Sequence, residues 1–117
     1  MLTPEIVIAE LDASLARTGQ DVVLRRYTAS AGNPRPKIDV PVRAFVRPVD
    51  DDTVKNLVGN LATPYFEVIT SPTGVQAVLP LVRGDKIVID GKERNIEMPK
   101  HIKFQDVLAR IKIVAAG

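Results

Sequence analysis

One dipeptide constrains the fold of this chain more than any other feature. Asp90-Gly91 lies between two runs in which apolar and polar side chains alternate. A two-residue type I′ turn needs a positive φ at both central positions, and Asp-Gly is a preferred pair there. We therefore predict a β-hairpin over residues 84–97. Three isoleucines are expected to point into the core: Ile87, Ile89 and Ile96.

The same turn predicts the register of the hairpin. It pairs Ile89 with Lys92 and Ile87 with Arg94, so two basic side chains near the tip share a face with core isoleucines. Their aliphatic stems are expected to lie along apolar surface while the charged groups reach water.

Alternation recurs along the chain and predicts further strands. These strands cover residues 21–28, 38–47, 65–69, 75–81 and 106–114. Pro41 has no backbone donor, so its strand is expected to lie at a sheet edge or to contain a bulge. The inward face of the last strand is expected to carry Val107, Ala109, Ile111 and Ile113.

Residues 3–18 are predicted to form the long helix of the chain. Thr3 is a suitable N-cap, Pro4 a suitable first helical residue and Gly19 a suitable stop. A narrow apolar stripe predicts that the helix packs on the outside of the β-structure. Its members are Ile8, Leu11 and Leu15.

These elements predict a mostly β fold. We expect one domain over residues 1–117, with the helix in residues 1–19 and, in residues 20–117, a small β-barrel or sandwich of five to seven antiparallel strands.

The segment 48–63 is less regular. Asp52 is expected to cap a short helical turn there, and the alternative of a calcium site at Asp50-Asp51-Asp52 lacks the usual ligand spacing.

The inventory of reactive side chains argues against an enzyme. The chain has no cysteine, which excludes disulfides, thiolate chemistry and cysteine-based zinc sites. His101 is the single histidine, and residues 99–103 are expected to be an exposed connection. No serine lies in a nucleophile elbow and no glycine-rich phosphate loop is present. We expect no catalytic, metal or cofactor site, no signal peptide and no membrane contact.

Arg83-Gly84-Asp85 resembles an integrin-binding tripeptide, but so short a match is weak. A turn at Gly84 with Asp85 at the strand boundary explains it better.

Charge is distributed unevenly, although the net charge is only +2. Residues 1–20 are net negative, residues 21–47 positive, residues 48–70 negative and residues 71–117 positive. Such alternation suits self-assembly between complementary faces. An ordinary mixed, solvated surface is an equally good explanation.

The positive block 21–47 also supports a second interpretation, binding of single-stranded nucleic acid around Tyr27 and Phe45. Its basic side chains are Arg25, Arg26, Arg35, Lys37, Arg43 and Arg47. Packing of both aromatic rings under the N-terminal helix is the simpler explanation. The exposed loop 29–37 contains two prolines and could order on docking. The candidate partner or DNA contacts are Arg35, Lys37, Arg43 and Arg47.

The segment from Pro80 to Ile96, PLVRGDKIVIDGKERNI, resembles the head-tail joining (stopper or head-closure) proteins of tailed phages. Their short chains carry a hairpin of this Gly-Asp, apolar strand, Gly, polar strand type, followed by a final strand like 106–114. The early strand, the proline-bearing loop and the second strand are also compatible with that family.

The resemblance implies a structural role for a small β-barrel. Copies would form a ring at the virion neck after assembly in the host cytoplasm. The ring would contact neck proteins on the adaptor or portal side and on the tail side, help to retain DNA, and make non-specific DNA contacts. A tail-completion or terminator protein, or a separate barrel that binds nucleic acid or a host protein, are the alternatives.

Overall fold

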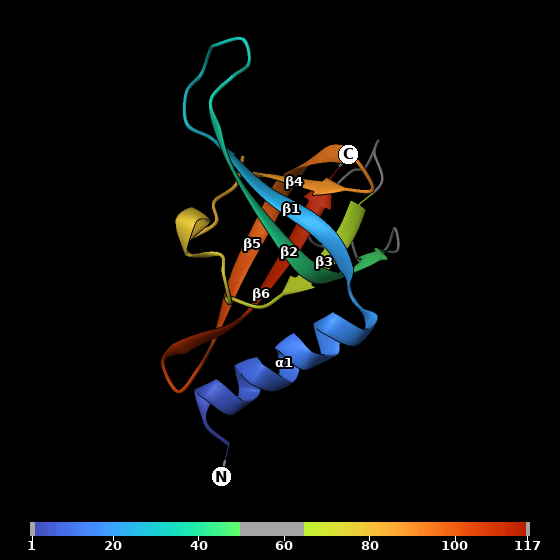
Figure 1. The fold of residues 1–117 in the computed structure, drawn as a ribbon, viewed down its shortest axis with the longest axis vertical. Helices are drawn as coiled ribbons and strands as arrows, with labels where there is room; N and C mark the ends of the chain where they lie inside the picture. The colour runs from blue at the N-terminus through green and yellow to red at the C-terminus, as the bar shows by residue number, and fades with distance from the viewer. Residues whose placement is uncertain (1, 50–64, 117) are drawn as a thin grey trace.

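A computed structural model describes residues 2–49 and 65–116, which form a closed antiparallel barrel with one helix packed against it (Figure 1). The neighbour order around the barrel is β1-β2-β3-β6-β5-β4, and β4 pairs with β1 to complete it. The strands are β1 (Gln20–Tyr27), β2 (Lys37–Pro48), β3 (Tyr65–Thr70), β4 (Lys86–Ile89), β5 (Lys92–Phe104) and β6 (Val107–Ala116). The predicted mostly β fold is confirmed, as a barrel. The predictions for residues 50–63, including the Asp52 cap, lie outside the described residues.

The β4–β5 hairpin has the predicted turn and register. Asp90 and Gly91 have φ values of 53° and 78°, as a type I′ turn requires. Ile89 pairs with Lys92 and Ile87 with Arg94. The Arg94 guanidinium lies 4.3 Å from the centre of the Phe66 ring, which gives this inward-facing basic residue a cation–π partner.

Aliphatic side chains fill the barrel. The predicted inward isoleucines are fully buried, together with residues from every other strand. Each fully buried Val, Ile or Leu contributes about 1.5–3 kcal/mol through removal of apolar surface from water. The largest fully buried aliphatic side chains are Leu24, Ile87, Ile89, Ile96, Ile111, Ile113, Val68, Val75 and Val78.

Helix α1 (Pro4–Thr18) begins and ends where the sequence predicts. The Ile6 N–H donates to Thr3 Oγ1, the predicted N-cap, and Leu11 and Leu15 are buried where the helix meets β2 and β6. Gly19 does not adopt the left-handed conformation of many helix-ending glycines, since its φ is −80°, and the position requires glycine for lack of space. A Cβ there would lie 2.6 Å from the Leu15 carbonyl oxygen. In the described part of the chain, no helix is long and apolar enough to cross a membrane.

Pro41 lies at a sheet edge, as predicted. On one side it pairs with Val23 of β1. On the other side, β3 pairs with β2 only from Ala44 onward. The missing donor of Pro41 therefore costs no ladder hydrogen bond, because that edge of β2 has no strand partner among the described residues.

Three sequence-based predictions are wrong. Residues 75–81 form no strand: the 3₁₀-helix η1 (Gln76–Val78) lies there, because a three-residue turn places Val75 and Val78 on one buried face. Residues 99–103 are no exposed connection but part of β5. Val107 is 44% exposed, because it pairs with Phe104 beside the turn at the end of the β5–β6 hairpin.

Candidate functional site

The loop between β1 and β2 projects beyond the barrel wall (Figure 1). Its residues from 30 to 37 are all exposed. The base of the loop is closed by the Thr28 N–H, which donates to the Pro36 carbonyl at 2.9 Å. We call residues 28–36 the projecting loop. It offers a surface that the rest of the described chain does not cover.

Arg35 lies at the base of the projecting loop. Its guanidinium is 4.2 Å from the centre of the Tyr27 ring, and its Nε donates to the Ala29 carbonyl at 2.6 Å. Lys37 is the first residue of β2, and its Nζ is 3.8 Å from Asp39 Oδ2. These two predicted contacts are two positions apart in the chain, and both are exposed.

An ion-pair network holds the ribbon below the projecting loop. Arg25 Nε lies 2.8 Å from Asp39 Oδ1, and its Nη1 lies 2.9 Å from Glu93 Oε2. The Tyr27 hydroxyl donates to the same Glu93 oxygen. The network links β1 to β2 on one side and to β5 beyond β4 on the other.

The network keeps its acids ionised. The hydrogen bond from Arg25 lowers the pKa of Asp39 below its ordinary value, and the same contact raises the pKa of Arg25. The pKa of Glu93 is lowered, chiefly by the hydrogen bond from the Tyr27 hydroxyl. The charge of Arg25 is thus matched inside the chain and is not free to attract a polyanion.

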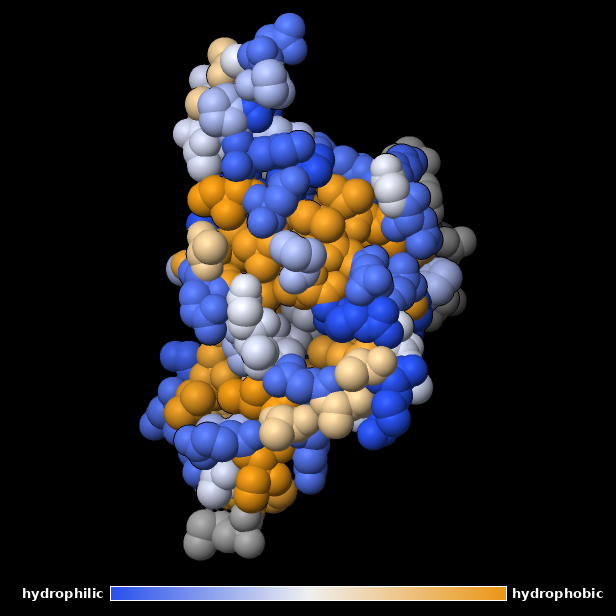
Figure 2. Space-filling model, in the orientation of Figure 1, coloured by the Kyte–Doolittle hydropathy of each residue, from blue (hydrophilic) through white to orange (hydrophobic). Residues whose placement is uncertain are grey.

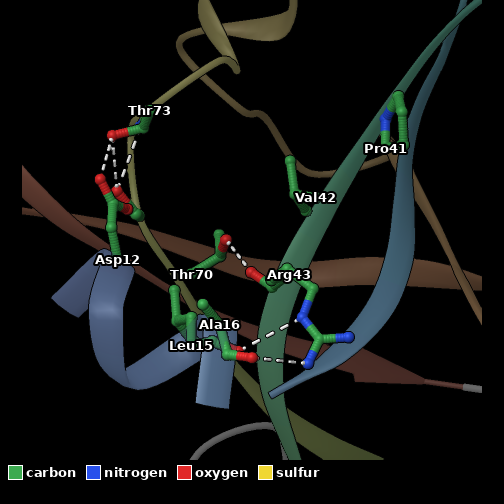
Figure 3. Close-up of a pocket in the computed structure, with 9 residues that line it drawn as sticks. Asp12, Leu15, Ala16, Pro41, Val42, Arg43, Thr70 and Thr73 are labelled. Carbon is green, nitrogen blue, oxygen red and sulfur yellow. Dashed lines mark hydrogen bonds between the residues drawn. The ribbon is translucent and has the colours of Figure 1, made fainter. Parts of the chain in front are cut away.

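Arg43 has a structural position at the end of α1 (Figure 3). Its Nη2 donates to the Gly19 carbonyl at 2.7 Å, and weaker bonds at 3.3 and 3.4 Å reach the carbonyls of Leu15 and Ala16. The Ala16 carbonyl lies in the last helical turn, where carbonyls lack helical partners, whereas the Leu15 carbonyl also accepts from the Gly19 N–H at 2.9 Å. A cation at this end of the helix also complements the helix dipole. Arg43 therefore attaches the helix to β2.

The hollow in Figure 3 lies beside this contact. It has a volume of about 230 Å³ and lies between α1 and the segment after β3. Thr73 Oγ1 donates to Asp12 Oδ2 at 2.8 Å across it. The Thr70 hydroxyl donates to the Arg43 carbonyl at 2.8 Å. The polar groups at the hollow are engaged with one another and join the helix to the barrel.

Arg47 lies near the far end of β2. Its side chain is 72% exposed and its Nη2 is 2.9 Å from Glu67 Oε1. It is ten positions beyond Lys37 along β2, a span of roughly 33 Å at about 3.3 Å per residue. The four predicted contacts therefore do not form one site: Arg35 and Lys37 lie together, whereas Arg43 and Arg47 lie apart from them and have other partners.

The basic cluster predicted for nucleic acid is also dispersed. Arg26 points into one end of the barrel and pairs with Asp85 at 2.7 Å. Phe45 lines a hollow with Leu11 of α1, as the packing interpretation predicts, whereas Tyr27 lies beside Glu93. In the Arg83-Gly84-Asp85 tripeptide, Gly84 has a φ of 101° and Asp85 comes directly before β4, as the turn-and-boundary explanation predicts, and the Asp85 carboxylate is buried.

The β5–β6 hairpin carries a basic surface that the sequence pattern did not predict. Lys100 pairs directly across from Lys112, although like charges at opposed positions are unfavourable. In the part of the chain that the structure describes, no carboxylate forms an ion pair with Lys100, Lys103 or Arg110. The basic residues on either side of the Gln105-Asp106 turn were the signal that could have revealed it.

An apolar groove adjoins this basic surface. It has a volume of about 440 Å³, and we call it the hairpin groove; its lining residues are Leu79, Pro80, His101, Lys103 and Leu108. The Leu81 N–H donates to His101 Nε2 at 3.1 Å, so the histidine fixes the segment after η1 to β5. Among residues 2–49 and 65–116, no group of three metal-ligating side chains gathers.

No protein-family model matches the sequence, and a comparison with curated proteins finds no match.

Proposed function

We propose that this chain is a structural connector protein of a tailed phage or prophage, a stopper or head-completion protein that forms a ring at the neck. In the neck it would contact the adaptor or portal side, help to retain DNA and dock the tail. The observation that carries the proposal is the projecting loop on a closed barrel. The proposal assigns no catalytic step to the chain.

A closed barrel suits such a role. Closure leaves few free strand edges, so association has to use side-chain surfaces and loops. The projecting loop reaches away from the barrel and carries Arg35, with Lys37 at its base. A loop of this kind can lie between neighbouring subunits or face a DNA channel, where its cations would offset phosphate charge.

Rigidity at the base of the loop supports the same proposal. The Arg25 network and the contact of Arg35 with Tyr27 hold the base in one arrangement. Less conformational freedom is then lost when the loop docks, which favours binding.

The test uses tail-less capsids of the phage or prophage whose genes adjoin this one. The purified chain should bind them and allow tails to join. Arg35→Glu combined with Lys37→Glu should reduce binding at least about tenfold. Lys92→Glu, at the β4–β5 turn, is the matched control and should bind normally.

Neighbouring genes for metabolic enzymes, or no binding of the unmodified chain to neck complexes, would overturn the proposal. A tail-completion or terminator role would appear as binding to isolated tails alone.

A second candidate function, nucleic-acid binding by the separate barrel, is favoured by the unpaired cations of the β5–β6 hairpin. It predicts salt-dependent binding of single-stranded DNA that falls in Lys100→Ala and Arg110→Ala. Arg43→Ala and Arg47→Ala should change it less, because those arginines have internal partners. Absence of binding at low salt would exclude this candidate.

A further inference from the structure

We propose that His101 is a pH-sensitive latch that holds the segment between η1 and β4 against β5. The neutral imidazole fastens Leu81 to the strand, and in acid the gain of a proton releases Leu81 and opens the hairpin groove. The latch lies within a single chain and does not depend on the connector proposal.

The hydrogen bond at the latch assigns a protonation state to the ring. The backbone N–H of Leu81 points at His101 Nε2 over a distance of 3.1 Å. A backbone N–H can only donate, so Nε2 has to accept and carries no proton. An imidazolium has a proton on both nitrogens, so the charged ring cannot accept this bond. The bond and the charged ring therefore exclude each other.

No acid lies against the ring in the groove. The hairpin groove is lined by His101, Lys103 and aliphatic side chains, with no carboxylate among these residues. Across the sheet, His101 is paired with Ile111 of β6, and η1 contains no ionisable side chain. A proton on His101 would therefore gain no acidic partner in the groove and would add a second positive charge beside Lys103.

The other ionisable groups of the neighbouring elements are engaged or face elsewhere. Arg26 of β1 and Asp85 reach the segment from the barrel side, where they pair with each other at 2.7 Å. On the outer face of β6, Arg110 lines a hollow beside α1, and Lys112 forms an ion pair with β3. Lys100 lies opposite Lys112 on that outer face. The titration of His101 is thus the one that acts directly on the Leu81 bond.

The segment has two further attachments, so its release is local. Arg26 Nη2 donates to the Pro80 carbonyl at 2.8 Å, and the Val82 N–H donates to Asp85 Oδ2 at 3.0 Å. These bonds do not involve the imidazole and hold the chain on either side of Leu81. Leu81 itself, which is 3% exposed, is therefore the part that leaves β5.

Release of Leu81 would enlarge an apolar surface. Leu79, Pro80 and Leu108 already line the hairpin groove, and Leu81 would join them. In Figure 2, hydrophobic side chains are exposed over the middle of the barrel, on the face where Figure 1 places η1. The chain would thus present more aliphatic surface in acid than at neutral pH.

The direction of the switch follows from proton linkage. Only the released ring can take up a proton, so the closed latch is favoured at high pH and is lost as the pH falls. Histidine is the side chain that ordinarily changes charge between about pH 5 and about pH 8. The lowered pKa values of Asp39 and Glu93 place their effect on the fold at more acidic pH, so the two effects are separable.

Amide hydrogen exchange of the full chain, measured by NMR, tests the latch. From about pH 7.5 to about pH 5.5, the protection factor of the Leu81 amide should fall at least about tenfold, because one hydrogen bond is lost. A protection factor is a ratio to the exchange rate of an unfolded chain, so the intrinsic effect of pH cancels. The Val82 amide, held by Asp85, is the internal control and should change little. The His101 ring resonances should titrate over the same range.

His101→Gln is the matched variant, because its amide can accept a hydrogen bond but does not titrate. Its Leu81 protection should be equal at the two pH values, whereas His101→Arg, with a permanent charge, should leave Leu81 unprotected at both. A fluorescent hydrophobic dye should bind the native chain more strongly at the lower pH and His101→Gln equally at both. Equal changes at Leu81 and Val82, or a fall at Leu81 that persists in His101→Gln, would overturn the latch.

Discussion

Arg26 on β1 forms a bidentate ion pair with Asp85, whose carboxylate is buried at one end of the barrel. The Nε–Oδ1 distance is 3.0 Å and the Nη2–Oδ2 distance is 2.7 Å. Nη2 also donates to the carbonyls of Val78 and Pro80, and the Val82 N–H donates to Asp85 Oδ2. The hydrogen bonds that Arg26 donates to Asp85 raise the pKa of Arg26 above its ordinary value. The pair thus joins β1, η1 and the start of β4.

Asp85→Ala is expected to lower the free energy of unfolding by about 3 kcal/mol, because it leaves Arg26 without its partner and the Val82 N–H without an acceptor. Urea denaturation followed by circular dichroism measures this. The double variant Arg26→Met with Asp85→Leu should recover a large part of the loss, since no charge is left unpaired. A loss below about 1 kcal/mol for Asp85→Ala would show that the Arg26–Asp85 pair does not hold this end of the barrel together.

Arg43→Met should destabilise the fold by about 1–2 kcal/mol, because it removes charge-assisted bonds to the helix carbonyls. Arg47→Met is the matched control on the same strand. Its pair with Glu67 is exposed on the arginine side, so the expected loss is about 0–1 kcal/mol. Thermal unfolding followed by the helical circular dichroism signal compares the stability of the two variants. Equal losses would contradict the assignment of Arg43 as the attachment of α1.

Acid should weaken the fold through Asp39 and Glu93. Both have a lowered pKa in the fold, so each stabilises it at pH above the ordinary values of 3.8 and 4.5. That contribution is lost as the pH falls through the lower folded-state values. Unfolding midpoints measured from pH 6 downward should fall for the native chain. Asp39→Asn with Glu93→Gln should begin less stable at pH 6 and decline less steeply. Identical slopes would contradict the prediction.

Gly91→Ala should cost about 1–2 kcal/mol, because Gly91 has a φ of 78°, where a Cβ is unfavourable. Asp90→Gly is the control: it keeps both turn residues permissive and should cost less than Gly91→Ala. Chemical denaturation of the two variants measures which of them loses more stability. A smaller loss for Gly91→Ala would mean that the turn relaxes to another type.

Local signals explain which elements could be predicted. The β4–β5 hairpin follows from Asp90-Gly91 alone, because a type I′ turn specifies both conformation and register. The full length of β5 could not be found in this way. Register shifts between Ile96 and Met98 and between Ile102 and Lys103 interrupt its period of two, so the strand does not alternate in sequence.

The site was less predictable than the fold for a different reason. Basic residues near one another in sequence were expected to share a surface, but their partners come from distant strands. Arg25 meets Glu93, and Arg26 meets Asp85. Only the closed barrel brings these acids to the arginines, and the unpaired cations are then left on the β5–β6 hairpin.

The seam that closes the barrel is short. β4 meets β1 through three residue pairs, Val23 with Val88, Leu24 with Ile87 and Arg25 with Lys86, although more than half of the chain separates the partners. The loop-closure entropy has to be overcome before these pairs can form, so the local hairpins are expected to assemble first and the seam last. Refolding should then take milliseconds to seconds, as in other β-proteins with non-local pairing. The same seam should be the first to exchange its amide hydrogens when the native barrel opens.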